Sequence, residues 1–150
     1  KNDKELGKND FSKIPNGLPG VQHRAQLIFT GGNVGKDSES IAKNEPHLDV
    51  TQFSALMSEN AAKIFGLYPE RGVIAPGAIA DITVWDPLHT ETITVETCLQ
   101  NVDYTPYEGF DVQGRAKYVI LNGKVCATEG RIIQEGKGTY LFRKTGFSEE

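Results

Sequence analysis

The hydrophobic pattern changes from helical spacing to strand spacing at Pro69, and this change constrains the fold more than any other feature of the chain. The segment "DVTQFSALMSENAAKIFGL" carries apolar residues at intervals of three and four, which is typical of one helical face. The members of this face are Phe53, Leu56, Met57, Ala61, Ile64 and Phe65. The first half of the chain is therefore predicted to be helical.

The ends of this predicted helix have clear signals. Asp49 is the expected N-cap, and Gln52 three residues later completes a capping box. Gly66 and then Pro69 should end the helix, because glycine favours the turn after a helix and proline cannot continue it. A shorter helix is expected in "GVQHRAQLIF", and a second short one is predicted in "SESIAKN".

After Pro69, valine and isoleucine alternate with Gly and Pro punctuation, which predicts short strands. The strand candidates are "GVIAPGAIADITVWDP", "TETITVE", "AKYVILNG", "KVCATEG" and "RIIQEG". Asn122-Gly123 between two apolar runs predicts a tight β-hairpin. Trp85 is expected in the core of this β region. About two helices followed by strands would pack poorly alone, so the chain resembles the end of a larger α/β protein.

Residues 1–20 lack an apolar period and are predicted to form a long loop, a kind of segment that is often functional. Its last eight residues, "KIPNGLPG", are unusually stiff. Pro15 and Pro19 lock φ, whereas Gly17 and Gly20 permit tight turns and close approach.

Charge and cysteine content exclude some classes of partner. A net charge of −4 gives no electrostatic reason to expect nucleic acid or an anionic membrane. No apolar run approaches the length of a membrane span. Cys98 and Cys126 lack CxxC spacing, which indicates reduced thiols and a cytoplasmic protein.

Three separated blocks together resemble one family. They are "ELGKNDFSKIPNGLPGVQHR", "SENAAKIFGLYPERGVIAPGAIADITVWDP" and "NVDYTPYEGFDVQGRAKYVILNGKV". In order, they resemble the C-terminal part of the cyclic amidohydrolases, and most closely dihydropyrimidinase and D-hydantoinase. The middle block alone is also similar to dihydroorotase and allantoinase, so the other two blocks narrow the choice.

The resemblance implies the C-terminal end of a metal-dependent (β/α)8 barrel followed by strands of a small composite β-sandwich. Residues 1–72 would form the final barrel loop and the closing helices. Residues 73–150 would form sandwich strands and the C-terminal tail. Since active sites of such barrels lie at the C-terminal ends of the strands, "KIPNGLPG" is expected at the mouth of the catalytic pocket.

The implied activity is hydrolytic opening of dihydropyrimidines or hydantoins to N-carbamoyl amino acids. In the family, the asparagine that matches Asn16 contacts the substrate ring through its main chain, so Asn16 is the one candidate substrate-binding residue. The alternative from the residues alone is a Pro/Gly turn that leads into the next helix.

The same family uses two divalent metal ions, usually zinc, held by a His-x-His pair, a carbamylated lysine, further histidines and an aspartate. This chain has only His23, His47 and His89, which are expected to be exposed or locally bonded. Neither Asp3 nor Asp10 precedes a histidine as the family's catalytic aspartate does. No catalytic or metal-binding residue is therefore assigned, the metal site is expected upstream of Lys1, and the segment alone is expected to be inactive.

Three alternatives remain open. The dihydropyrimidinase-related adaptor proteins share the fold without the metal ligands, but typically carry an acidic residue in place of Asn16 and lack Pro19. Another cyclic amidohydrolase, such as allantoinase or dihydroorotase, and an independent binding module are the others. The resemblance also implies a homo-oligomer, dimer or tetramer, with Tyr140, Leu141 and Phe142 in the tail as interface anchors.

Overall fold

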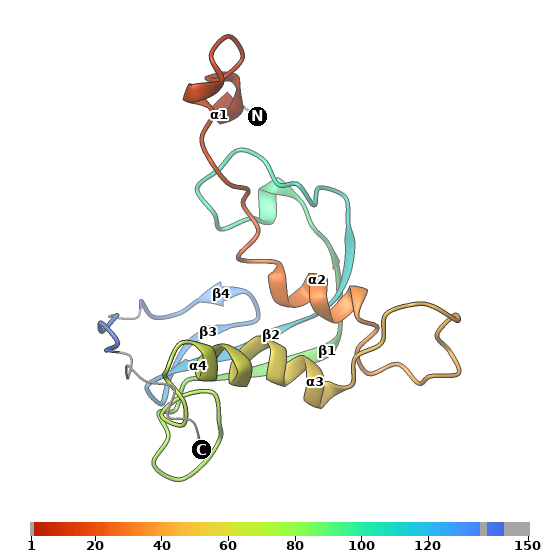
Figure 1. The fold of residues 1–150 in the computed structure, drawn as a ribbon, viewed down its shortest axis with the longest axis vertical. Coiled ribbons are helices and arrows are strands. Elements are labelled where there is room, and N and C mark those ends of the chain that lie inside the picture. Colours follow the sequence, from red (N-terminus) through yellow and green to blue (C-terminus); the bar gives the residue numbers. More distant parts are fainter. Residues whose placement is uncertain (1, 136–137, 143–150) are drawn as a thin grey trace.

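The computed structural model describes residues 2–135 and 138–142, and shows helices followed by one antiparallel sheet (Figure 1). The helical elements are α1 (Asn2–Glu5), η1 (Phe11–Lys13), α2 (Arg24–Gly31), α3 (Val50–Ser54), η2 (Ala55–Glu59), α4 (Asn60–Ile64) and η3 (Val95–Thr97). The strands are β1 (Ile82–Thr92), β2 (Asp111–Leu121), β3 (Lys124–Thr128) and β4 (Arg131–Ile132). The predicted order of helices and then strands is confirmed.

The sheet has four strands in the order β1-β2-β3-β4, and every neighbouring pair is antiparallel. The predicted hairpin joins β2 to β3, where Leu121 pairs with Lys124. Asn122 and Gly123 have φ of 49° and 75°, as a tight hairpin turn requires. Pro87 lies inside β1 between Asp86 and Thr90, where the register shifts, and it is tolerated because β1 is an edge strand.

The long predicted helix forms, with a π-helical turn, η2, between α3 and α4. Its capping box is confirmed, since the Asp49 carboxylate accepts from the Gln52 N–H at 2.7 Å and the Gln52 side chain accepts from the Asp49 N–H at 3.0 Å. Ala62, not Ala61, is the buried alanine. The wider π turn places Ala62 five residues after Met57 on the inward side, so the predicted face was partly wrong.

The predicted short helix in "SESIAKN" is wrong, because residues 38–44 form turns. Asp37 accepts the main-chain N–H of Ser40 on its side chain at 2.7 Å. Side chains such as Asp and Ser compete in this way for the backbone bonds that a helix needs. The long loop predicted over residues 1–20 contains two short helical turns, α1 and η1, and is otherwise irregular.

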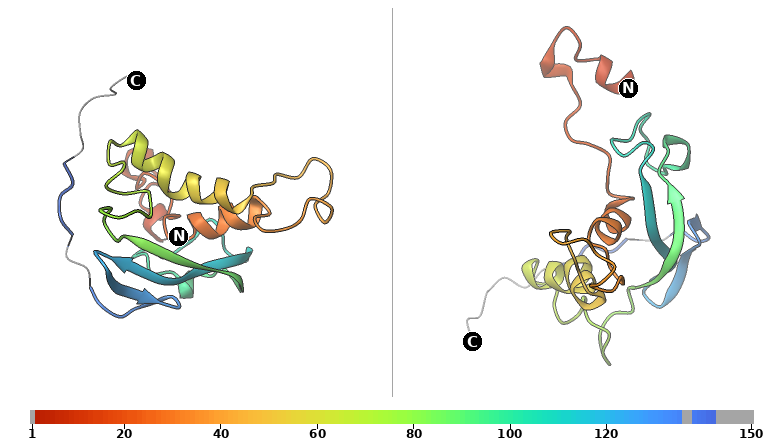
Figure 2. Two further views of the ribbon diagram at one scale, coloured as in Figure 1. Left: turned by 90° about the horizontal axis from the view of Figure 1, so that it is seen from below. Right: turned by 90° about the vertical axis from the view of Figure 1, so that its right-hand side faces the viewer.

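The core lies between the sheet and the helices on one of its faces (Figure 2). Phe29 of α2 and Phe53 of α3 meet edge-on with centroids 5.3 Å apart, and Trp85 of β1 lies 5.5 Å and 5.6 Å from them. Trp85 is thus a core residue, but helices cover it rather than a second sheet. The described residues form a single sheet, so the composite sandwich stays a prediction.

Among the described residues, no helix has the length and apolar character needed to span a bilayer. Cys98 is half-buried and Cys126 is buried, and both are free thiols, as the sequence predicted.

Candidate functional site

The loop that carries Asn16 is built from short-range hydrogen bonds. Asp10 caps η1 by accepting from Ser12, at 2.7 Å from the hydroxyl and 3.1 Å from the main-chain N–H. These two bonds, with a smaller contribution from Lys13, hold the pKa of Asp10 below its usual value. Beyond η1 the chain runs without regular structure to Gly20, and Gly17 has φ of 78°. Asn16 is exposed on this irregular stretch.

Lys4 of α1 reaches the peptides on either side of Asn16. Its ammonium donates to the carbonyl of Pro15, and to the carbonyl of Gly17 at 3.1 Å. Within residues 2–135 and 138–142, no hydrogen bond reaches the main chain of Asn16 itself. The N–H and C=O of Asn16 are therefore available to a ligand. Sequence reasoning missed Lys4, because nothing local marks a lysine that binds a loop more than ten residues away.

The aromatic block "YTPYEGF" lies next to this loop. The Lys4 ammonium is 5.9 Å from the centroid of the Tyr104 ring. A Cβ atom built on Gly20 would lie 3.4 Å from the Tyr107 ring, so only a small residue fits there comfortably. Two of the three sequence blocks that define the resemblance thus meet in space, although the residues in contact, Gly20 and Tyr107, lie more than eighty positions apart in the chain.

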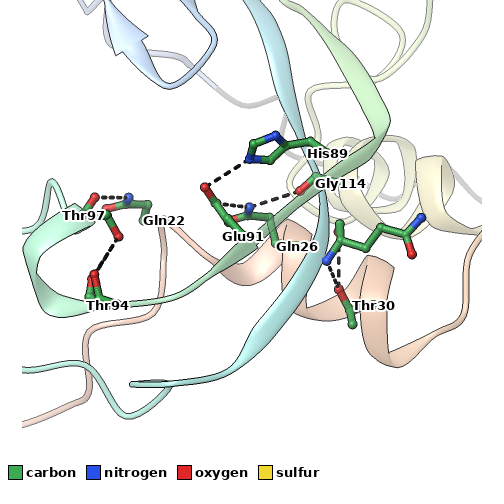
Figure 3. A network of polar contacts seen from close by, with 9 residues as sticks. Gln22, Gln26, Thr30, His89, Glu91, Thr94, Thr97 and Gly114 are labelled. Atoms are coloured by element: carbon green, nitrogen blue, oxygen red, sulfur yellow. Dashed lines mark hydrogen bonds and ion pairs between the residues drawn. The ribbon is translucent and has the colours of Figure 1, made fainter.

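A second polar cluster joins α2 to the sheet (Figure 3). Gln26 donates at 2.5 Å to Glu91 of β1 and at 3.1 Å to the carbonyl of Gly114 of β2. His89 lies 3.3 Å from the other carboxylate oxygen of Glu91. Burial acts to raise the pKa of Glu91, but the hydrogen bonds from Gln26 and His89 outweigh it and lower the pKa overall. Glu91 is therefore a structural anion that ties the helix layer to the sheet.

The histidines differ from one another in environment. His23 is only 2% exposed, and its Nδ1 has no hydrogen-bond partner in the described part of the chain, so the expectation that it is exposed or locally bonded was wrong. Its position at the start of α2 turns the ring inward, and burial lowers its pKa although Glu91 opposes the effect. His47 is exposed and His89 is locally bonded, as predicted. No group of three or more His, Cys, Asp or Glu side chains that could hold a metal occurs in the described ranges.

A surface cavity of about 400 Å³ lies between α2 and the first two strands. Its lining residues are Thr30, Thr90, Glu91, Thr92, Asp111, Val112 and Gln113. Two pairs of its lining residues are hydrogen-bonded: the Thr92 hydroxyl donates to Asp111 at 2.6 Å, and the Thr30 hydroxyl accepts from the N–H of Gln113 at 2.9 Å. No residue of the Asn16 loop lines it.

Comparison with known proteins identifies the class. Residues 32–126 match the model of the amidohydrolase family. The chain belongs to that family. Within it, the chain is 40% identical over 146 residues to a D-hydantoinase of Ralstonia pickettii, which covers 96% of this chain and 29% of that protein. It is also 40% identical to mouse dihydropyrimidinase-related protein 5, over 91% of this chain and 23% of that protein.

Solved structures agree with these relatives. D-hydantoinase from Bacillus sp. AR9 superposes with a TM-score of 0.80 at 36% identity, covering 97% of this chain and 30% of that one. D-hydantoinase (dihydropyrimidinase) from Thermus sp. superposes with a TM-score of 0.74 at 37% identity, and the match covers 89% of this chain and 27% of that one. The predicted resemblance to the D-hydantoinase and dihydropyrimidinase group is confirmed. The chain spans less than a third of the length of each of these relatives.

Proposed function

We propose that this chain is the C-terminal segment of a metal-dependent cyclic amidohydrolase that opens dihydropyrimidine or hydantoin rings to N-carbamoyl amino acids. The observation that carries the proposal is the 40% identity to a D-hydantoinase over 96% of the chain. In this proposal, residues 1–72 supply the last barrel loop and closing helices. Residues 73–150 supply strands and tail of a β-sandwich that the rest of the protein completes.

Exposed apolar residues on the long helix support a larger parent protein. Leu56, Ile64 and Phe65 are 50%, 68% and 57% exposed, although a helix of this length normally buries its apolar stripe. Packing against further barrel elements would cover them. We therefore assign the outward side of α3–η2–α4 to contacts with the remainder of the barrel.

The role of the chain in the reaction is to hold the ring. A cyclic imide presents alternating N–H and C=O groups along one edge, and a peptide presents the matching donor and acceptor in fixed geometry. The main chain of Asn16 is exposed and unbonded within the described residues, so it suits this role. Asn16 would orient the ring while water adds across one amide: the C–N bond breaks, hydroxyl joins the carbonyl carbon and a proton joins the nitrogen.

The metal ions belong to the part of the protein upstream of Lys1 in this proposal. Two divalent ions, with zinc as the expected metal, would activate the attacking water there. A protein of this kind would act in the cytoplasm as a homo-oligomer.

The main alternative is a non-catalytic adaptor, since dihydropyrimidinase-related protein 5 is as similar as the hydantoinase. The loop favours the enzyme. The side chain of Asn16 is uncharged and Pro19 restricts the loop backbone. The adaptors typically carry an acidic residue in place of Asn16 and lack the proline at the position of Pro19. Another cyclic amidohydrolase, such as allantoinase or dihydroorotase, is the second alternative.

The test uses the intact protein that carries this segment, loaded with zinc and assayed on dihydrouracil, hydantoin, allantoin and dihydroorotate. Turnover of either of the first two supports the proposal. If the protein turns over neither dihydrouracil nor hydantoin, whether or not it turns over allantoin or dihydroorotate, the proposal is contradicted.

Two variants then test the main-chain role. Asn16→Ala keeps the peptide and should cost less than threefold in kcat/KM. Gly17→Ala meets no neighbour, but it disfavours the positive φ at Gly17 and should cost about tenfold because the peptide edge rotates. A large loss in Asn16→Ala with none in Gly17→Ala would show that the side chain, not the main chain, binds the ring.

A further inference from the structure

We propose that Lys4 is the residue that orients the peptide edge of Asn16 toward the ring, and so acts as a positioning residue for substrate binding. The proposal rests on the proposed function of the loop. The observation that supports the role of Lys4 is that its ammonium group donates to the carbonyls of both Pro15 and Gly17, which flank Asn16 in the chain.

Peptide geometry converts these two bonds into an orientation. In a trans peptide the C=O and the N–H point in opposite directions across a rigid plane. The carbonyl of Pro15 shares its plane with the N–H of Asn16, and the carbonyl of Gly17 shares its plane with the N–H of Leu18. Since both carbonyls point at Lys4, both N–H groups point away from it. Lys4 thus aligns two donors on the side of the loop opposite to α1.

The charge of Lys4 also strengthens those donors. An ammonium on a carbonyl oxygen draws electron density through the amide, and hydrogen bonds in a chain polarise one another. The N–H groups of Asn16 and Leu18 are therefore better donors to a ring carbonyl than ordinary amides. A neutral side chain of the same length would fill the space without this effect.

The position of Lys4 is itself held by packing. A Cβ atom on Gly7 would lie 1.9 Å from Cγ1 of Ile14, so only glycine lets the turn after α1 lie this close to the loop. The centroid of the Tyr104 ring lies 5.9 Å from the ammonium. The ammonium thus lies near the aromatic block and bonds to both loop carbonyls.

The first experiment measures the loop directly. Hydrogen exchange of residues 14–20 is followed by mass spectrometry in the intact protein, for Lys4→Met, Lys4→Arg and the control Lys8→Met. Lys8 is an exposed neighbour that forms an ion pair with Glu5 at 3.5 Å and makes no hydrogen bond or ion pair with the Asn16 loop in the described part of the chain. The N–H groups of Asn16 and Leu18 carry no hydrogen bond within the described residues, so an ammonium on the carbonyls of their peptides should speed their base-catalysed exchange. We therefore expect exchange at Asn16 and Leu18 to slow severalfold in Lys4→Met and to stay unchanged in Lys4→Arg and Lys8→Met. Unchanged exchange in Lys4→Met overturns the proposal.

The second experiment separates orientation from general stability. The kcat/KM of each variant is measured on dihydrouracil and on its thiocarbonyl analogues, whose sulfur accepts hydrogen bonds weakly. If Lys4 orients the donors, Lys4→Met should lower kcat/KM on dihydrouracil about tenfold, mostly by raising KM. On the analogue in which sulfur replaces the contacted oxygen, Lys4→Met should lower kcat/KM less than about threefold. Lys4→Arg, which keeps the charge, should restore most of the oxo preference.

The outcomes separate the two proposals. Equal losses on oxo and thio rings in Lys4→Met would mean that Lys4 only supports the fold, and would overturn its positioning role. A wild-type protein that opens neither ring would overturn the proposed function and the ring-orienting role with it. If the wild-type protein turns over normally and Lys4→Met has unchanged kinetics, the positioning role of Lys4 is overturned and the proposed function stands.

Discussion

Asp81 accepts a hydrogen bond of 2.8 Å on Oδ1 from the main-chain N–H of Asn122, which lies 41 residues further along the chain. Its other oxygen, Oδ2, pairs with Nε of Arg71 at 2.8 Å. One carboxylate thus ties the start of β1 to the hairpin turn and to the segment after the long helix. The bond from Asn122 contributes most to lowering the pKa of Asp81, burial opposes it, and Arg71 lowers it further.

The lowered pKa of Asp81 predicts acid sensitivity. Because the folded-state pKa lies below the ordinary 3.8, the stabilisation is present above pH 3.8 and is lost as the pH falls through the folded-state pKa. Asp81→Asn should lower the free energy of unfolding of the intact protein by about 1–2 kcal/mol at pH 7 and by less at pH 2.5. Urea unfolding at the two pH values measures this. Glu96→Gln, at an exposed acid, is the control, and an equal loss at both pH values would contradict the prediction.

Gly114 is predicted to be intolerant of any side chain. A Cβ atom there would lie 2.6 Å from Nε1 of Trp85, and its φ is 83°. Gly114→Ala should destabilise the protein by about 2–4 kcal/mol through strain and overpacking together. Gly109 is the control, because its φ is 80° and a Cβ atom there would meet nothing within 4 Å. Gly109→Ala therefore measures the backbone strain without overpacking. Thermal melts that show equal losses for the two variants would show that Trp85 moves aside freely.

Gln26 is predicted to keep Glu91 ionised. Gln26→Leu removes the 2.5 Å donor while burial remains, so the pKa of Glu91 should rise. Carbon-detected NMR titration of the Glu91 carboxyl measures the shift. Gln22→Leu is the matched control, because Gln22 bonds to Thr97 and Leu99 rather than to Glu91. A pKa of Glu91 that is unchanged in Gln26→Leu would assign the effect to His89 instead.

The start of the tail is predicted to be an oligomer interface. Tyr140 and Phe142 are 78% and 87% exposed, and their rings pack edge-to-face with centroids 4.8 Å apart. Changing both to Asp should shift the intact protein toward smaller species in sedimentation velocity. Ile74→Asp changes a residue that is 83% exposed elsewhere and should leave the mass unchanged. The predicted extension beyond Phe142 lies outside the described residues.

The isolated chain is predicted to be poorly soluble or molten. Its buried core is small, centred on Phe29, Val34 and Phe53, while many large apolar side chains stay exposed. Circular dichroism should show helix and strand signals without a sharp cooperative melt. A sharp two-state melt of dilute monomer would contradict the assignment to a larger barrel.

Features made of neighbouring residues were predictable from the sequence. The capping box of Asp49 and Gln52 closes within three residues, and the hairpin at Asn122-Gly123 depends on two backbone angles. Such features follow from local hydrogen bonds and φ preferences, which a short segment carries with it. The family resemblance is likewise a property of the sequence, and it made Asn16 the candidate substrate-binding residue.

The tertiary structure alone decided which distant groups meet. Lys4 reaches the carbonyls beside Asn16, His23 turns inward rather than to solvent, and Trp85 packs under helices. The π turn moved the buried position to Ala62, against the ideal 3.6-residue period. These outcomes depend on burial and on contacts between segments far apart in the chain, and no local pattern encodes their distance or direction.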